Sequence, residues 1–140
     1  MNKDYVAGFV DGEGSLCIIR HNGKYTTTYA PHLSIVNTDR KVLEDIALWF
    51  GVGKVYLADK VQSGDGYNRR HCFTLNVHGS TIVEVLPRFM NSLIVKHEQG
   101  KVLLEAASLV GGTGVHITED TRQRLSDLCD YIQWLNQGCL

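Results

Sequence analysis

Residues 3–14, "KDYVAGFVDGEG", constrain the fold more than any other segment, because they combine an apolar helical run with glycines and acids. Residues 3–11 are typical of a short helix, and we expect Gly12 and Gly14 to end it. Gly8 and Gly12 are four positions apart, so they share one helix face. A face without side chains allows close backbone approach, which predicts that this helix packs against a second helix.

The rest of the chain alternates between strand and helix patterns. Apolar and alternating segments predict strands at residues 15–20, 28–36, 54–61 and 69–77, joined pairwise by turns at 21–27 and 62–68. Apolar periodicity predicts helices at 38–50, 98–110 and 118–137, two short helical pieces around Pro87, and a linker at 111–114. We therefore expect an α+β fold with one antiparallel four-stranded sheet covered on one face by helices. A length of 140 residues suits a single domain, 1–140.

The charge of the chain is unevenly distributed along the sequence. The net charge is −1, which by itself does not indicate a nucleic-acid partner. The predicted strand regions, 15–36 and 53–78, nevertheless contain six Lys or Arg and only two acids. Residues 98–140 contain three Lys or Arg and six acids. The strands therefore form the basic part of the molecule, which favours an anionic partner there.

The cysteines and the apolar segments indicate the cellular compartment in which the protein is expected. The four cysteines lie at positions 17, 72, 129 and 139 and form no C-x-x-C pair, so a zinc site or a disulfide framework is not expected. Reduced thiols are typical of an intracellular protein, in the cytoplasm of a prokaryote or in an organelle. We expect no membrane-spanning segment and no signal peptide, and the sequence predicts no organic cofactor.

Residues 6–14, "VAGFVDGEG", resemble the signature of the LAGLIDADG homing endonuclease family position by position. The segments "GVGKVY" at 51–56 and "LIVKHEQGKVLL" at 93–104 are similar to further family segments, so the resemblance covers about residues 3–110. It implies the αββαββα LAGLIDADG fold with a DNA-binding sheet. Only one copy of the motif is present, and single-motif members of the family act as homodimers.

The activity implied by this resemblance is hydrolysis of phosphodiesters on both strands of a long, nearly palindromic double-stranded DNA target. Glu13 is the expected metal ligand, and the backbone carbonyl of Gly12 is a second one. Two Glu13 carboxylates close to a two-fold axis would favour a divalent cation that neutralises them. Mg²⁺ suits an oxygen site, Mn²⁺ is an alternative, and Ca²⁺ is a non-cleaving substitute. We expect Asp11 to have a structural role near the helix end.

The resemblance implies further site residues by position. Lys96 matches a basic residue close to the scissile phosphate. Asn37 stands where relatives place a residue that orders water, although a helix cap explains it equally well. Lys41 stands near a second basic position, although a solvated helix face also explains it. The residues expected at the dimer interface are Val6, Gly8, Phe9 and Gly12.

Strand parity selects the residues expected to contact DNA. Side chains that point away from the helices would meet base edges in the major groove. On the strands these candidates are Cys17, Ile19, His21, Thr28, His32, Ser34, Lys54, Tyr56, Lys60, Asn68, Arg70 and Thr74, and at the turns Asn22, Lys24, Tyr25 and Gln62. Arg20 breaks the alternation of its strand, so its direction stays open.

Two other functions are consistent with the same sequence. The fold can serve as an RNA maturase that assists intron splicing, or as a non-cleaving nucleic-acid-binding domain. Outside the family, a small metal- or phosphate-binding protein with a polar sheet is a further alternative. That alternative gives no reason for the shared face of Gly8 and Gly12.

Overall fold

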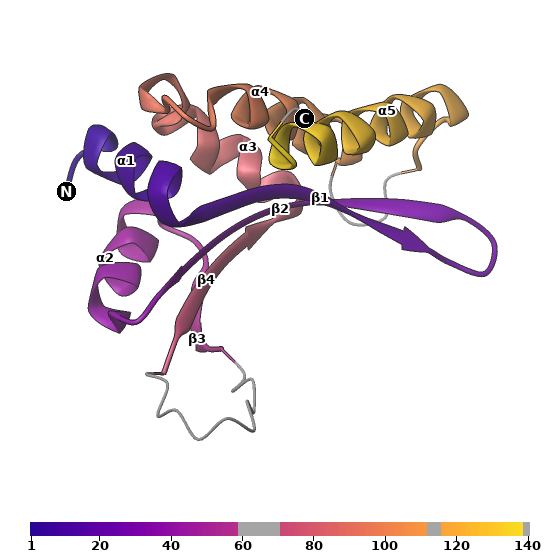
Figure 1. Cartoon of the computed structure of the whole chain (residues 1–140). Helices are drawn as coiled ribbons and strands as arrows, with labels where there is room; N and C mark the ends of the chain where they lie inside the picture. Colours follow the sequence, from indigo (N-terminus) through magenta and orange to yellow (C-terminus); the bar gives the residue numbers. More distant parts are fainter. Residues whose placement is uncertain (59–70, 112–115, 139–140) are drawn as a thin grey trace.

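The computed structural model describes residues 1–58, 71–111 and 116–138. Within this part of the chain, four strands form one antiparallel sheet in the order β1-β2-β4-β3 (Figure 1). The strands are β1 (Gly14–Asn22), β2 (Thr27–Asn37), β3 (Lys54–Leu57) and β4 (Phe73–His78). The predicted turn at 62–68, the strand residues 59–61 and 69–70, and linker residues 112–114 lie outside the described residues.

The helices follow the predicted order. They are α1 (Lys3–Glu13), α2 (Arg40–Phe50), α3 (Ile82–Val85), α4 (His97–Val110) and α5 (Glu119–Asn136), with short 3-10 turns at Gly79–Thr81, Leu86–Arg88 and Met90–Ser92. Pro87 lies in the turn that follows α3, where its missing N–H costs no helical hydrogen bond. None of the helices in the described residues combines the length and the apolar character that a membrane span requires. Figure 1 shows α3, α4 and α5 gathered over β1 and β2.

Helix α1 begins at Lys3, as predicted, but it ends later than the sequence prediction. The N–H of Tyr5 donates to Oδ1 of Asn2, which caps the helix at 2.9 Å. The helix continues through Gly12 to Glu13, so the expectation that Gly12 ends it was wrong. Glycine lowers helix stability without excluding the helical conformation. Here the last turn is held by Gly14, whose N–H donates to the Val10 carbonyl.

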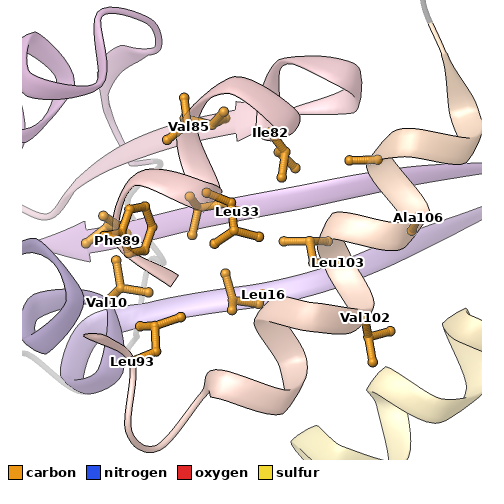
Figure 2. Close-up of a cluster of buried hydrophobic side chains, with 14 of the residues drawn as sticks. Val10, Leu16, Leu33, Ile82, Val85, Phe89, Leu93, Val102, Leu103 and Ala106 are labelled. Carbon is orange, nitrogen blue, oxygen red and sulfur yellow. The ribbon is translucent and has the colours of Figure 1, made fainter. Parts of the chain in front are cut away.

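The core lies between the sheet and the helices. In the central parts of β1 and β2 every second side chain is buried, as the alternation predicts, namely Leu16 and Ile18 on β1 and Pro31, Leu33 and Ile35 on β2. Figure 2 shows the centre of this core, where side chains from α1, both of these strands, α3 and α4 meet. It labels Val10, Leu16, Leu33, Ile82, Val85, Phe89, Leu93, Val102, Leu103 and Ala106, and each is at most 5% exposed. Because the helices cover only one face of the sheet, the side chains on the other face remain accessible to a partner.

Helix α5 covers the edge strand β1 and determines the direction of the Arg20 side chain. The amide of Asn136 donates to the Leu16 carbonyl at 2.9 Å, and the Cys129 thiol to the Ile18 carbonyl at 3.3 Å. These contacts occupy carbonyl groups of a strand edge that would otherwise be open to pairing. The Arg20 guanidinium lies 2.9 Å from the Asp130 carboxylate, so this side chain points to the helices.

Gly14 joins α1 to β1 at a point without room for a side chain. A Cβ placed there would lie 2.7 Å from the Val10 carbonyl oxygen, a backbone atom that cannot move aside freely. We therefore expect Gly14→Ala to lower the free energy of unfolding by about 1–3 kcal/mol, measured by urea denaturation. The neighbouring Ser15→Ala is the control, since Ser15 is exposed, and it should change stability by less than about 0.5 kcal/mol. Equal stability of the two variants would contradict the close packing of this junction.

Candidate active site and nucleic-acid interface

The Asp11 carboxylate fastens the end of α1 to the segment before α4. Its Oδ2 accepts the N–H of Ile94 at 2.8 Å, and its Oδ1 accepts the N–H of Lys96 at 2.9 Å. Burial alone would raise the pKa of Asp11, but hydrogen bonds from the N–H groups of residues 94–96, together with the charge of Lys96, hold the pKa below its ordinary value. Both carboxylate oxygens are thus engaged, which agrees with a structural role.

The same contact places a cation at the carboxyl end of α1. The Lys96 ammonium group donates to the backbone carbonyl of Asp11. A positive charge is favourable at this end of a helix, where carbonyl groups point outward. The next two residues of the helix are Gly12 and the exposed Glu13. Lys96 and Glu13, 83 positions apart in the sequence, therefore lie at the same end of α1.

The donor atoms at this helix end suit a hard divalent cation. Glu13 offers an exposed carboxylate, and the Gly12 carbonyl belongs to the last turn, where carbonyls lack helical partners. Oxygen ligands of this type are those that Mg²⁺ takes. Among residues 1–58, 71–111 and 116–138, however, no three His, Cys, Asp or Glu side chains group in a way that could hold a metal ion. A metal site at this helix end would therefore need further ligands from a second chain or from a substrate.

The two remaining candidates for catalysis lie close to α2. Asn37 is two residues beyond Ile35, which pairs with Gly14, so it lies at the sheet end next to the end of α1. Its Oδ1 accepts the N–H of Asp39 at 2.8 Å, and Asp39 rather than Asn37 caps α2. Lys41 forms an ion pair with Asp45 at 3.0 Å, and its side chain is 80% exposed. Neither residue is joined to the end of α1 by a hydrogen bond or an ion pair, so Lys41 is best described as part of a solvated helix face.

The sheet face that points away from the helices contains most of the candidate DNA contacts. Burial alternates along the strands, and the candidates occupy the less buried positions. These are Cys17, Ile19, His21, Thr28, His32, Ser34, Lys54, Tyr56 and Thr74. Asn22 ends β1, and Lys24 and Tyr25 lie in the β1–β2 turn. Lys60, Gln62, Asn68 and Arg70 lie outside the described residues. We use the term outer face for the nine strand residues in the list from Cys17 to Thr74, together with four strand residues that the next paragraph adds.

The strand register adds three residues that sequence reasoning missed. Asn76 pairs with both Ser34 and Lys54, and His78 pairs with His32. Val36 pairs with Thr74 in the same way. Val36 and Asn76 lie within the predicted strands and His78 lies one residue beyond, so following the alternation to the end of each strand would have found them. The outer face therefore also includes Val36, Asn76 and His78, together with Ala30.

Helix α1 turns its two glycines to solvent. Gly8 and Gly12 are exposed, and a Cβ at either would meet no atom within 4 Å. Phe9 is half-buried, with its ring 6.0 Å from that of Tyr5. Val6 is fully buried in its own chain, so its assignment to a dimer interface was wrong. The reason is helical geometry, because a residue two positions from Gly8 lies on the opposite side of the helix.

Solved structures of homing endonucleases are similar to this fold. I-CvuI, solved with its DNA target in the presence of 2 mM Ca, superposes with a TM-score of 0.76 at 20% identity, over 95% of this chain and 80% of that one. The archaeal intron-encoded I-Vdi141I complexed with DNA gives 0.76 at 21% identity, over 95% and 82%. I-TnaI gives 0.73 at 19% identity, over 99% and 97%.

No curated protein matches the chain. The family model described as LAGLIDADG endonuclease matches residues 6–89, which is more than half of the chain and includes most of α1 and the four strands of the described residues. The chain belongs to the LAGLIDADG endonuclease family.

Proposed function

We propose that this protein is a site-specific DNA endonuclease that acts as a homodimer and requires a divalent cation. The observation that carries the proposal is the contact between Asp11 and Lys96, which sets a lysine ammonium beside the helix end that bears Glu13. The exposed Glu13 carboxylate forms no hydrogen bond or ion pair with the described residues, and the Lys96 ammonium lies at the same helix end. A carboxylate and a cation are the groups needed to hold a metal ion and to stabilise a phosphate.

Each group has a role that follows from its chemistry. A cation held by Glu13 and the Gly12 carbonyl would supply Lewis-acid stabilisation and an activated water. Lys96 would place its positive charge toward the scissile phosphate, where negative charge develops during hydrolysis. The Asn37 amide nitrogen remains available to orient water, since only the amide oxygen is used by Asp39. The Asp11 carboxylate holds Lys96 in place and takes no part in the reaction.

The exposed surface around α1 supports a homodimer. The glycine face of α1 is open, and large apolar side chains flank it: Leu48 is 82% exposed, Ile94 87% and Val95 70%. A hollow of about 500 Å³ lined by Met1, Tyr5, Asp45, Leu48 and Trp49 lies beside the helix. Exposed apolar surface of this kind is typical of an interface. A second α1 against the glycine face would bring the two Glu13 residues together.

The outer face supports double-stranded DNA as the partner. It is long, polar and rich in groups that donate to or accept from base edges, and β-ribbons can enter the major groove. The similar proteins I-CvuI and I-Vdi141I were both solved with DNA. Two copies related by a two-fold axis would read two related half-sites, which makes the target long and nearly palindromic.

Glu13→Gln tests the metal site. The target is first identified by cutting a pool of randomised duplex DNA with and without Mg²⁺ and sequencing the ends. The variant keeps the size of the side chain but loses its charge, so we expect cleavage to fall by at least about 10³-fold while DNA affinity changes by less than about threefold. Glu84→Gln, at an exposed site on α3, is the matched control and should cut normally. Retained cleavage by Glu13→Gln would remove Glu13 from the site.

Gly8→Leu tests the dimer. The added side chain meets no atom of its own chain, so the monomer should stay folded, but it fills the face that a second helix needs. We expect analytical ultracentrifugation to show a shift from two chains to one, with an unchanged circular dichroism spectrum. Ser108→Leu adds the same side chain at an exposed position of α4 and should remain dimeric. An unchanged dimer in Gly8→Leu would rule out packing through this face.

Asp11→Asn tests the positioning of Lys96. The amide can replace only one acceptor oxygen, so an N–H of residues 94–96 loses its partner, and we expect a loss of about 1–3 kcal/mol in stability together with slower cleavage. Asp45→Asn, in an exposed ion pair, should cost less than about 1 kcal/mol.

The pH dependence of the stability difference between wild type and Asp11→Asn is a separate check. The pKa of Asp11 is lowered in the folded protein, so its carboxylate contributes fully to stability at pH values above its ordinary pKa of 3.8. This contribution is lost as the pH falls through the lower pKa of the folded protein. The stability difference between wild type and Asp11→Asn, followed by urea unfolding, should therefore be constant from neutral pH to about pH 5. A difference that already shrinks between those values would contradict the assignment.

A further inference from the structure

Two histidines lie side by side on the outer face of the sheet. His32 of β2 and His78 of β4 are directly paired in the strand register, with ring centroids 6.3 Å apart. His32 is also the pairing partner of Cys17 on β1, so the pair lies within a row that crosses three strands. Neither imidazole forms a hydrogen bond with another group of the described residues. Their ring nitrogens are therefore available to a molecule that lies on this face.

The surroundings of the pair contain no acid that would balance a positive charge. The neighbouring outer-face positions are Cys17 on β1, Ala30 and Ser34 on β2, and Asn76 on β4, with Lys54 of β3 one step further on. The turn Gly79–Thr81 that follows His78 adds no titratable group. Over the described outer face as a whole, no position is Asp or Glu, and Lys54 is the one Lys or Arg.

The charge state of the pair therefore depends on the partner. Burial lowers the pKa of His32, and the charge of His78 lowers it further, so the free protein resists protonation of His32 at neutral pH. DNA would bring phosphates close to the pair, and negative charge favours the protonated form. Binding would then favour proton uptake by His32.

Protonation also changes which base the pair can recognise. A neutral imidazole has one N–H donor and one acceptor, whereas an imidazolium has two donors. Guanine presents two acceptors, N7 and O6, in the major groove. A protonated ring cannot accept a hydrogen bond from adenine N6 or cytosine N4. A protonated pair, donating from one N–H of each ring, therefore matches the two acceptors of guanine, whereas a neutral pair can also match bases that present a donor.

We propose that His32 and His78 together read base edges in the DNA target, with a preference for guanine that appears only when the pair carries a proton. The inference rests on the proposed endonuclease function, because it requires DNA against the outer face. It gives this endonuclease a target preference that shifts with pH near neutrality.

The test is selection from a randomised pool of duplex DNA, with Ca²⁺ to prevent cleavage. Selections at about pH 6 and about pH 8 are carried out at equal ionic strength, and the bound DNA is sequenced. We expect guanine to be enriched at one symmetry-related pair of positions at the lower pH only. Affinity for the sequence selected at the lower pH, measured by fluorescence anisotropy, should be about tenfold greater there than at about pH 8.

Single substitutions assign the effect to the pair. His78→Gln and His32→Gln should each abolish the pH-dependent guanine enrichment. His78 is exposed, so its variant remains informative if the half-buried His32 variant folds poorly. His116→Gln is the matched control, because His116 is an exposed histidine ahead of α5, and it should behave as the wild type does.

The outcomes separate this inference from the proposed function. A selected target whose base preferences are equal at both pH values would overturn the inference and leave the endonuclease proposal intact. Tighter binding at the lower pH without a guanine preference would also overturn it, since the histidines would then contact only phosphates. Failure of the wild type to select any sequence at either pH would overturn both.

Discussion

The contact of Asp11 with residues 94–96 is the constraint on which the candidate site depends. Leu93 is buried while Ile94 and Val95 are exposed, and the backbone bends at residues 94–96. A carboxylate that accepts two N–H groups fixes this turn, and the adjacent backbone carbonyl holds the Lys96 ammonium. One residue at the end of α1 thus determines where a cation from a distant segment lies. Without it, nothing else in the described residues joins Lys96 to this helix end.

The two faces of helix α1 differ, because one packs into the core and the other is exposed. Val6, Ala7 and Val10 are fully buried and join the helix to the core of its own chain. Gly8 and Gly12 lie on the opposite side and leave it bare. Bulky residues on the glycine side would keep a second helix at a distance, and polar residues on the valine side would cost core stability. The unusual composition of the segment follows from meeting both conditions within eleven residues.

The sequence was sufficient for features that depend on local periodicity. Strand alternation correctly separated buried from outer-face positions, and Asp11 was correctly given a structural role at the helix end. Features that depend on distant partners were not accessible in this way. The direction of Arg20 is decided by Asp130, 110 positions later. Val6 was misassigned because the motif shows which residues line a helix without showing which side the core of the chain occupies.

The distribution of charge explains why the net value of −1 says little about DNA binding. Arg20, the one basic residue of β1, is turned to the helices and paired with an acid of α5. The acids of the carboxyl-terminal half are placed with the helices, while the described outer face holds no acid and one lysine. The described part of this face, being so poor in fixed charge, attracts phosphates weakly, so its hydroxyl, amide and imidazole groups have to supply most of the recognition there. On such a face a single proton gained by a histidine alters the local charge as much as an added lysine would.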